Sequence, residues 1–140
     1  MPLSTAPSLR PTGSSARPKR EWRLHKHADY QRVYAAGRKQ FSSLMTYFAA
    51  PRTSADTGQG TRIGITAGKV LGKAVERNRI KRRMRAAIVA NLDLLHSDLD
   101  VVLHPKRAVL HAEWAALGNE VRSIFVKIEE SHARGMERKT

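Results

Sequence analysis

The sequence has no cysteine, few acidic residues and no long apolar run. Without thiols the protein forms neither disulfides nor thiolate metal sites, and this composition fits a reducing cytoplasm. No apolar stretch approaches the ~18 residues that a membrane-spanning helix needs. The apolar core of a secretory signal is also missing. These absences predict a cytoplasmic protein without a membrane segment.

Acidic residues are scarce relative to basic ones. Twelve Asp and Glu stand against 26 Lys and Arg, which gives a formal net charge of +14 and a sequence pI of about 11.1. Such an excess of positive charge implies an acidic partner. The chain has 140 residues, 41% of them hydrophobic, which is enough for one domain with one core. The composition therefore predicts a folded domain that binds a polyanion.

Proline is concentrated at the start of the chain. Residues 1–20 hold four of the six prolines, several Ser and Thr, and basic residues without any acid. The prolines would break the amphipathic helix of a mitochondrial targeting peptide. We therefore predict a disordered basic arm over residues 1–20, a folded domain over 21–134 and a short basic tail over 135–140.

Half of the net charge lies between Lys69 and Arg85, where eight Lys or Arg accompany one acid, Glu76. No Pro or Gly interrupts the chain from Lys73 to Leu99, and the apolar residues there repeat with the period of a helix. One side of the predicted helix is apolar: Ile80, Met84, Ala87, Ile88, Leu94 and Leu95. The other side is polar and basic: Asn78, Lys81, Arg82 and Arg85, with Arg79 at its border.

This basic side differs from an ordinary solvated helix face, which usually interleaves charges of both signs. Here nearly all charges are positive, and like charges four residues apart, such as Arg77 and Lys81, destabilise a helix. A bound polyanion would relieve that repulsion. The pattern therefore favours a nucleic-acid-binding face over a merely solvated one.

The other periodicities predict an α+β fold. The expected elements are a short helix over 21–37, strands over 38–50 and 61–67, the basic helix ending near residue 96, a strand over 98–104 and a helix over 111–132. Residues 51–60 form a loop. Three consecutive apolar residues, Val101 to Leu103, predict a well-buried last strand. The last helix has a long apolar stripe: Trp114, Leu117, Val121, Ile124, Phe125 and Ile128.

Five of the eight aromatic residues fall within a short part of the chain: Tyr30, Tyr34, Phe41, Tyr47 and Phe48. They could pack the first helix against the first strand. They could also form a platform on which single-stranded bases stack, with little preference for sequence. From the sequence both interpretations stay open, and a neighbouring basic helix favours stacking for one or two of them.

No catalytic constellation is recognisable. The six histidines lack metal-ligand spacing, and no nucleophile is paired with a base. Gly68, Gly72 and Lys73 hint at a phosphate loop, but the spacing is one residue short and Ala74 replaces the required hydroxyl residue. Asp98 and Asp100 could bind magnesium or simply end a helix. We therefore predict no metal site and no catalytic residue.

The basic segment resembles the signature of the bacterial ribonuclease P protein component, an Arg-Asn-Arg core that follows a Lys-x-x-Gly-x-Ala-Val turn. The matching residues are Lys69, Gly72, Ala74, Val75, Arg77, Asn78, Arg79, Ile80, Lys81 and Arg82. The resemblance extends over residues 23–128, and the N-terminal arm lies outside it. The chain departs from the family pattern at Glu76, at His27 near a helix N-terminus, and at His104, where an Arg often precedes the proline.

The resemblance implies a fold and a role. The fold is a small two-layer sandwich of order αββαβα, with one extra short strand allowed and an unusual left-handed βαβ crossover. The protein binds the ribonuclease P RNA, which is the catalyst, and the 5′ leader of precursor tRNA. Mg²⁺ is required by the holoenzyme but lies mostly on the RNA. Outside the ribonucleoprotein the protein is a monomer.

The resemblance also implies two sets of site residues. Those that bind the RNA subunit are Lys69, Lys73, Arg77, Asn78, Arg79, Lys81, Arg82 and Arg85. Those that line a cleft for the leader are Tyr30, Tyr34 and Phe48, with Tyr47 as the alternative to Phe48. Two other classes remain: a ribosomal or ribosome-assembly RNA-binding protein without a cleft, and a protein-only nuclease, which would need clustered acids for two metals.

Overall fold

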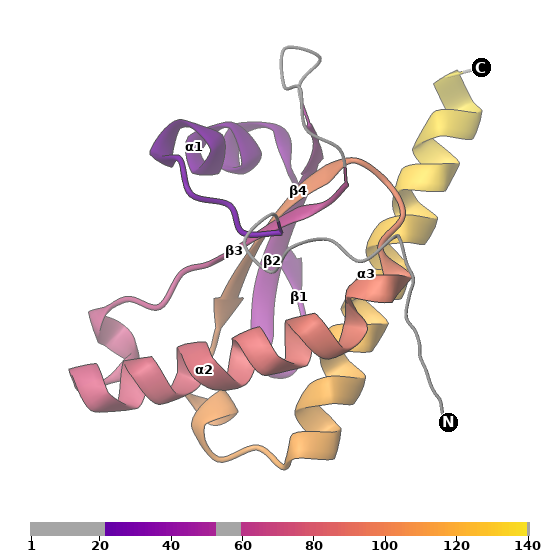
Figure 1. Ribbon diagram of the computed structural model, residues 1–140. Helices are drawn as coiled ribbons and strands as arrows, with labels where there is room; N and C mark the ends of the chain where they lie inside the picture. The colour runs from indigo at the N-terminus through magenta and orange to yellow at the C-terminus, as the bar shows by residue number, and fades with distance from the viewer. Residues whose placement is uncertain (1–21, 53–59, 140) are drawn as a thin grey trace, which may run out of the picture.

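The computed structural model describes residues 22–52 and 60–139 (Figure 1). The arm expected over residues 1–20 lies outside these residues. The helices are α1 (His27–Ala36), α2 (Ala74–Asn91) and α3 (Trp114–Lys139), and the strands are β1 (Gln40–Phe41), β2 (Met45–Pro51), β3 (Arg62–Ile65) and β4 (Leu99–Pro105). Three 3₁₀ turns are η1 (Lys69–Leu71), η2 (Leu92–Leu94) and η3 (Arg107–Leu110).

The predicted order of elements is confirmed, with one extra short strand, while four boundaries differ. Helix α2 ends at Asn91 rather than near residue 96, so Leu94 and Leu95 lie beyond it, in and after the turn η2. Helix α1 begins at His27 rather than near Glu21, because the preceding residues pair with β3: Leu24 N donates to Ile63 O at 3.0 Å. The strand expected over 38–50 is divided into β1 and β2. Helix α3 continues to Lys139, through residues expected to form a tail.

The four strands form one sheet in the order β1-β2-β4-β3. Strand β2 is antiparallel to β1 and to β4, with Phe48 opposite Val102. Strand β3 is parallel to β4, with Gly64 opposite Val102. The parallel pair is connected through α2, which is therefore the crossover helix. The left-handed sense of this connection stays a prediction of the family resemblance.

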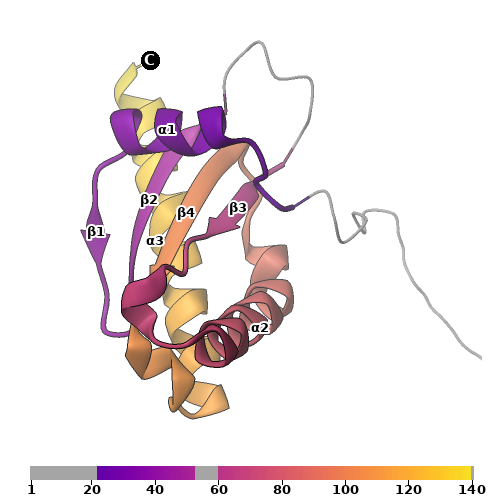
Figure 2. The same cartoon turned by 90° about the vertical axis from the view of Figure 1, so that its left-hand side faces the viewer.

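Helices cover the two faces of the sheet unequally (Figure 2). Helices α2 and α3 share the large core with one face, and their predicted apolar stripes are confirmed: Ile80, Met84, Ala87 and Ile88 on α2, and Leu117, Val121, Ile124, Phe125 and Ile128 on α3. Trp114 is the exception, 51% exposed at the first residue of α3. None of the described helices is long and apolar enough to cross a membrane.

Helix α1 crosses the strands near one end of the opposite face (Figure 2). Adjacent residues of β4 point to opposite faces of the sheet: Val101 belongs to the large core, and Val102 belongs to a small cluster under α1. This cluster buries Leu24, Val33, Ala50 and Val102. Val33 is the only α1 residue that is fully buried, and burying such a side chain stabilises by roughly 1.5–3 kcal/mol. Tyr30 and Tyr34 of α1 are half-buried against the same cluster, so three residues make the apolar attachment of α1.

Candidate nucleic-acid interface

Helix α2 presents a row of cations without acidic partners. Asn78, Arg79 and Arg82 are exposed, as are Lys69 on η1 and Lys73 at the N-cap, whereas Arg77, Lys81 and Arg85 are half-buried. Among the side chains that the structure describes, in residues 22–52 and 60–134, none of these forms an ion pair. The row can therefore bind phosphates without first breaking contacts inside the protein.

Two arginines of the basic segment, Arg83 and Arg77, are partly enclosed by the protein, and Arg83 is bound to its backbone. Arg83 donates to Leu110 O at 2.9 Å and also to Ala112 O, so it ties α2 to the connection before α3. Arg77 is half-buried, and its Nε has no hydrogen-bond partner among the described residues. The basic segment thus combines side chains free for a ligand with Arg83, whose guanidinium is used for folding.

Glu76, the single acid of the segment, stabilises the start of α2. Its Oε1 accepts from Lys73 N at 3.1 Å, and its Oε2 lies 2.8 Å from Arg107 Nη2. Arg107 also donates to Leu71 O at 2.7 Å. Gly72 allows this arrangement, because its φ is +120° and a Cβ there would lie 2.3 Å from Arg107 Nη1. The acid that departs from the family pattern therefore caps the basic helix rather than opposing its ligand.

These contacts of Glu76 predict a pH-dependent contribution to the stability of the fold. The hydrogen bond from Arg107, followed by that from the Lys73 amide, lowers the pKa of Glu76 to about 2. A carboxyl whose folded-state pKa is depressed contributes stability above its unfolded pKa, and that contribution disappears as the pH falls toward about 2. The melting temperature of Glu76→Gln is expected to be below that of the parent at pH 6, with the difference shrinking toward pH 2. A difference that stays constant over this range would contradict the assignment.

A second surface lies between α1 and the sheet, where three rings meet. Tyr34 of α1 and Phe48 of β2 make an edge contact with ring centroids 5.0 Å apart. His104 of β4 lies 5.6 Å from each of them. Tyr34 Oη is 2.9 Å from His104 Nε2 and 3.4 Å from Thr66 Oγ1. All three rings are half-buried, so part of each remains open to a ligand.

Sequence reasoning noted His104 as a departure from the family but did not place it in this cluster. The signal was available in the two-residue period of a strand, which puts His104 on the same face as Val102. Burial, and to a lesser extent the Lys39 charge, lowers the pKa of His104. The ring is therefore neutral at pH 7, and its Nε2 can accept a hydrogen bond from the Tyr34 hydroxyl.

Tyr30 lies beside this cluster, with its ring across the backbone of β3. A Cβ at Gly64 would lie 2.3 Å from Tyr30 Oη, so a larger residue would displace the ring. The hydroxyl donates to Leu24 O at 3.2 Å. Tyr30 is therefore half-buried and firmly held, with less of its ring surface available than a free platform would offer.

The structure corrects the prediction for Tyr47. This residue is 6% exposed and belongs to the large core with Met45, on the face covered by α2 and α3. Adjacent residues of a strand point to opposite faces, so Tyr47 and Phe48 could not both face α1. Phe41 lies opposite Thr46 on the short strand β1 and makes no ring contact with Tyr34, Phe48 or His104; it is 72% exposed, with Lys39 Nζ 5.4 Å from its ring centroid.

The basic side of α2 and Tyr30 of α1 meet at a pocket beside β3, which Tyr34, Phe48 and His104 do not line. This pocket of ≈ 190 Å³ is lined by Tyr30 and Gly64 from the α1 side and by Lys81 and Arg85 from α2, with Arg23 among its other residues. The basic helix and Tyr30 of α1 therefore border one concave site rather than lying on unrelated parts of the molecule.

Asp98 and Asp100 both accept hydrogen bonds from other residues of the protein. Asp100 is fully buried and binds two arginines, Arg62 and Arg32. Asp98 Oδ1 accepts from Gly60 N at 2.5 Å. Both carboxylates are thus used to hold the protein together.

Known proteins match this chain over most of its length. The sequence model of the ribonuclease P family matches residues 19–129. The ribonuclease P protein component of Desulforapulum autotrophicum is 35% identical over 119 residues, which cover 85% of this chain and 97% of that protein. The one from Symbiobacterium thermophilum is 32% identical, covering 76% of this chain and 90% of that protein.

Solved structures show the same fold. An RNase P protein mutant from Staphylococcus aureus, described as defective in mRNA degradation activity, superposes with a TM-score of 0.67 at 24% identity, over 80% of this chain and 91% of that one. The RNase P protein from Thermotoga maritima gives a TM-score of 0.64 at 17% identity, over 75% of this chain and 96% of that one.

Proposed function

The chain belongs to the ribonuclease P protein family, the protein subunit of the ribonucleoprotein that processes the 5′ end of tRNA, and from this premise we propose how its two surfaces divide the work. The basic side of α2 binds the ribonuclease P RNA, and the aromatic surface between α1 and the sheet binds the single-stranded 5′ leader of precursor tRNA. The observation that carries the proposal is the row of α2 cations, which form no ion pair with the side chains that the structure describes and which share a pocket with Tyr30 of α1.

The α2 row suits a folded RNA. Guanidinium groups bind phosphates through two parallel hydrogen bonds, and Arg79 and Arg82 are exposed for such contacts. Each phosphate that is neutralised releases counterions, so affinity falls as salt rises. These contacts lower the repulsion between the catalytic RNA and its RNA substrate without reading either sequence.

The ring surface suits a single strand. Bases of any sequence can stack on Tyr34 and Phe48, because every base has a π face. A leader that varies from one precursor to another needs this tolerance. Tyr30 and His104 border the same surface and limit where a base can lie.

The chain itself supplies no reacting group in this proposal. The RNA subunit, with Mg²⁺ held mainly by its phosphates, hydrolyses the phosphodiester bond between leader and tRNA. The protein orients the precursor and increases its affinity as a single copy within the ribonucleoprotein. Its cytoplasmic location belongs to the same proposal, since precursor tRNA is the substrate.

The experiment that tests the proposal measures precursor tRNA cleavage by the cognate RNA, with and without the protein, at low Mg²⁺. We expect the protein to restore cleavage that the RNA alone performs poorly, because the added positive charge replaces part of the missing Mg²⁺. RNA-free protein is expected to cleave nothing. Cleavage by the protein alone, or no effect on the RNA, would contradict the proposal, and the latter would favour a ribosome-assembly role.

A further inference from the structure

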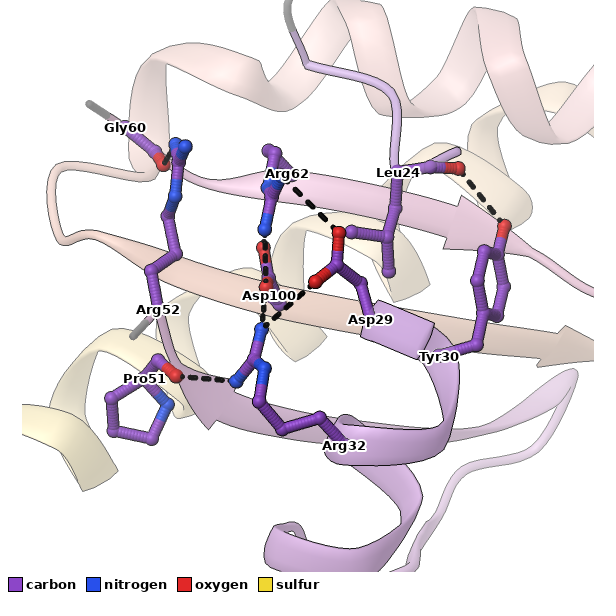
Figure 3. Close-up of polar contacts among 9 residues, drawn as sticks. All are labelled: Leu24, Asp29, Tyr30, Arg32, Pro51, Arg52, Gly60, Arg62 and Asp100. Carbon is purple, nitrogen blue, oxygen red and sulfur yellow. Dashed lines mark hydrogen bonds and ion pairs between the residues drawn. The ribbon is translucent and has the colours of Figure 1, made fainter. Parts of the chain in front are cut away.

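Helix α1 is attached to the sheet by apolar packing and by ion pairs, and Figure 3 shows the polar contacts. Val33 is the only residue of α1 that is fully buried, and Tyr30 and Tyr34 are half-buried against the same small cluster. Two charged side chains of its first turns, Asp29 and Arg32, also bind to residues of the sheet. Charged contacts therefore add directed attachments to the apolar packing of α1.

The centre of these contacts is Asp100 of β4, which is 0% exposed. Arg62 of β3 binds it as a fork, with Nε 2.8 Å from Oδ1 and Nη2 2.7 Å from Oδ2. Arg32 of α1 donates from Nη2 to the same Oδ2 and from Nη1 to Pro51 O at 2.9 Å. One arginine of α1 thus reaches both β4 and the end of β2 (Figure 3).

Asp29 completes the cluster. Its Oδ2 lies 3.5 Å from Arg62 Nη1, and its Oδ1 lies 4.0 Å from Arg32 Nη2. Two carboxylates therefore face two guanidinium groups, which satisfies the requirement that a buried charge be paired. Planar guanidinium forks also fix direction as well as distance. We refer to Asp29, Arg32, Arg62 and Asp100 as the clamp.

The clamp lies next to the ring surface along α1. Tyr34 follows Arg32 by half a helical turn, and its hydroxyl must reach His104 at 2.9 Å while its ring meets Phe48 at 5.0 Å. A small rotation or lift of α1 would open both contacts. At the C-terminal end of α1, Gly37 lies close to β2, since a Cβ at Gly37 would be 2.8 Å from Ala49 O.

We propose that Arg32, Arg62 and Asp100 are positioning residues that hold α1 at a fixed height and angle over the sheet, so that the leader meets a preformed ring surface. This inference rests on the proposed leader-binding role of that surface. A preformed site binds more tightly because the cost of ordering it is met during folding.

The main test uses Arg32→Met in the assembled holoenzyme. This change keeps the apolar stem and leaves the Arg62–Asp100 fork intact, so no buried charge loses its only partner. The ratio of precursor to mature tRNA affinity is expected to fall at least about fivefold, the lower end of what one stacked base contributes. Arg32→Lys, which keeps the charge and one contact, is expected to recover part of the ratio.

Arg107→Met is the matched control. Arg107 also joins a carboxylate, Glu76 at 2.8 Å, and a backbone carbonyl, Leu71 O at 2.7 Å, but at the N-terminus of α2. Arg107→Met removes one positive charge, as Arg32→Met does. Any loss of tRNA affinity that comes from net charge alone is therefore expected equally in both variants. The precursor-to-mature ratio of Arg107→Met is expected to stay at the parent value.

A distance measurement tests the positioning directly, in the full-length protein. Because the chain has no cysteine, spin labels can be placed at Ala35→Cys on α1 and Ala90→Cys on α2, both exposed positions. The distance distribution is expected to broaden or shift with Arg32→Met and to stay narrow with Arg107→Met. An unchanged distribution would overturn the proposal.

An unchanged affinity ratio in Arg32→Met would also overturn it, whatever the distances show. Phe48→Ala measured alongside tells the two possible failures apart. If Phe48→Ala lowers the ratio and Arg32→Met does not, the leader site stands and the clamp does not position it. If neither lowers the ratio, the leader site itself is wrong.

Discussion

Replacing Phe48 with alanine is expected to weaken precursor tRNA binding to the holoenzyme by ~1–3 kcal/mol, which corresponds to roughly 5- to 150-fold. Phe48 is half-buried and contacts Tyr34 and His104, so its removal takes away one ring of the surface on which a leader base would stack. Mature tRNA has no leader, and its affinity is expected to change little.

The measurement is the affinity of the holoenzyme for precursor and mature tRNA over a salt series. Stacking removes no charge, so the salt dependence is expected to stay nearly constant. Trp114→Ala is the matched control, because Trp114 is 51% exposed on α3 and lies apart from the ring surface. If Phe48→Ala weakened the binding of precursor and mature tRNA equally, with the protein still folded, the rings would have a purely structural role.

Replacing Arg79 and Arg82 together with alanine is expected to weaken binding of the ribonuclease P RNA by roughly 100-fold at about 0.1 M salt, since each lost phosphate contact changes the salt slope by about 1. Both side chains are exposed on α2 without an ion pair among the described residues, so folding is expected to be little affected. Binding is expected to weaken for precursor and mature complexes alike.

The measurement is the slope of log affinity against log salt for the protein and its RNA subunit. A control that removes the same charge is Arg122→Ala with Lys127→Ala, two exposed cations of α3. That control is expected to change the slope much less. If the two double variants lowered the RNA affinity and the salt slope equally, the protein would bind RNA through its overall charge rather than through the α2 face.

Much of the basic helix could be predicted because its signals are local. The apolar residues from Ile80 to Ile88 repeat at the helical period, and they are buried in the structure. The exposed side of the same helix follows from the same period. The function of Glu76 could not be predicted this way, because its partner Arg107 lies on a separate element, η3.

The ring surface could be predicted in part. The strand period requires Tyr47 and Phe48 to face opposite sides, but it does not say which side α1 covers. The structure decided this, by burying Tyr47 among the residues packed on α2 and α3. His104 joined the rings only through the pairing of β4 with β2, where it lies opposite Thr46.

By itself the sequence determined the order of the elements, the cationic face of α2 and the family, because each depends on residues close together in the chain. Only the tertiary structure decided how α1 is held over the sheet. Arg32, Arg62 and Asp100 come from three elements, and the sequence pattern around each one indicates only a surface charge. In the structure both arginines bind the buried carboxylate of Asp100. Two opposite charges interact strongly only where folding excludes water and brings them close together. Because the partners are far apart in the sequence, no local pattern of residues predicts that they will come together.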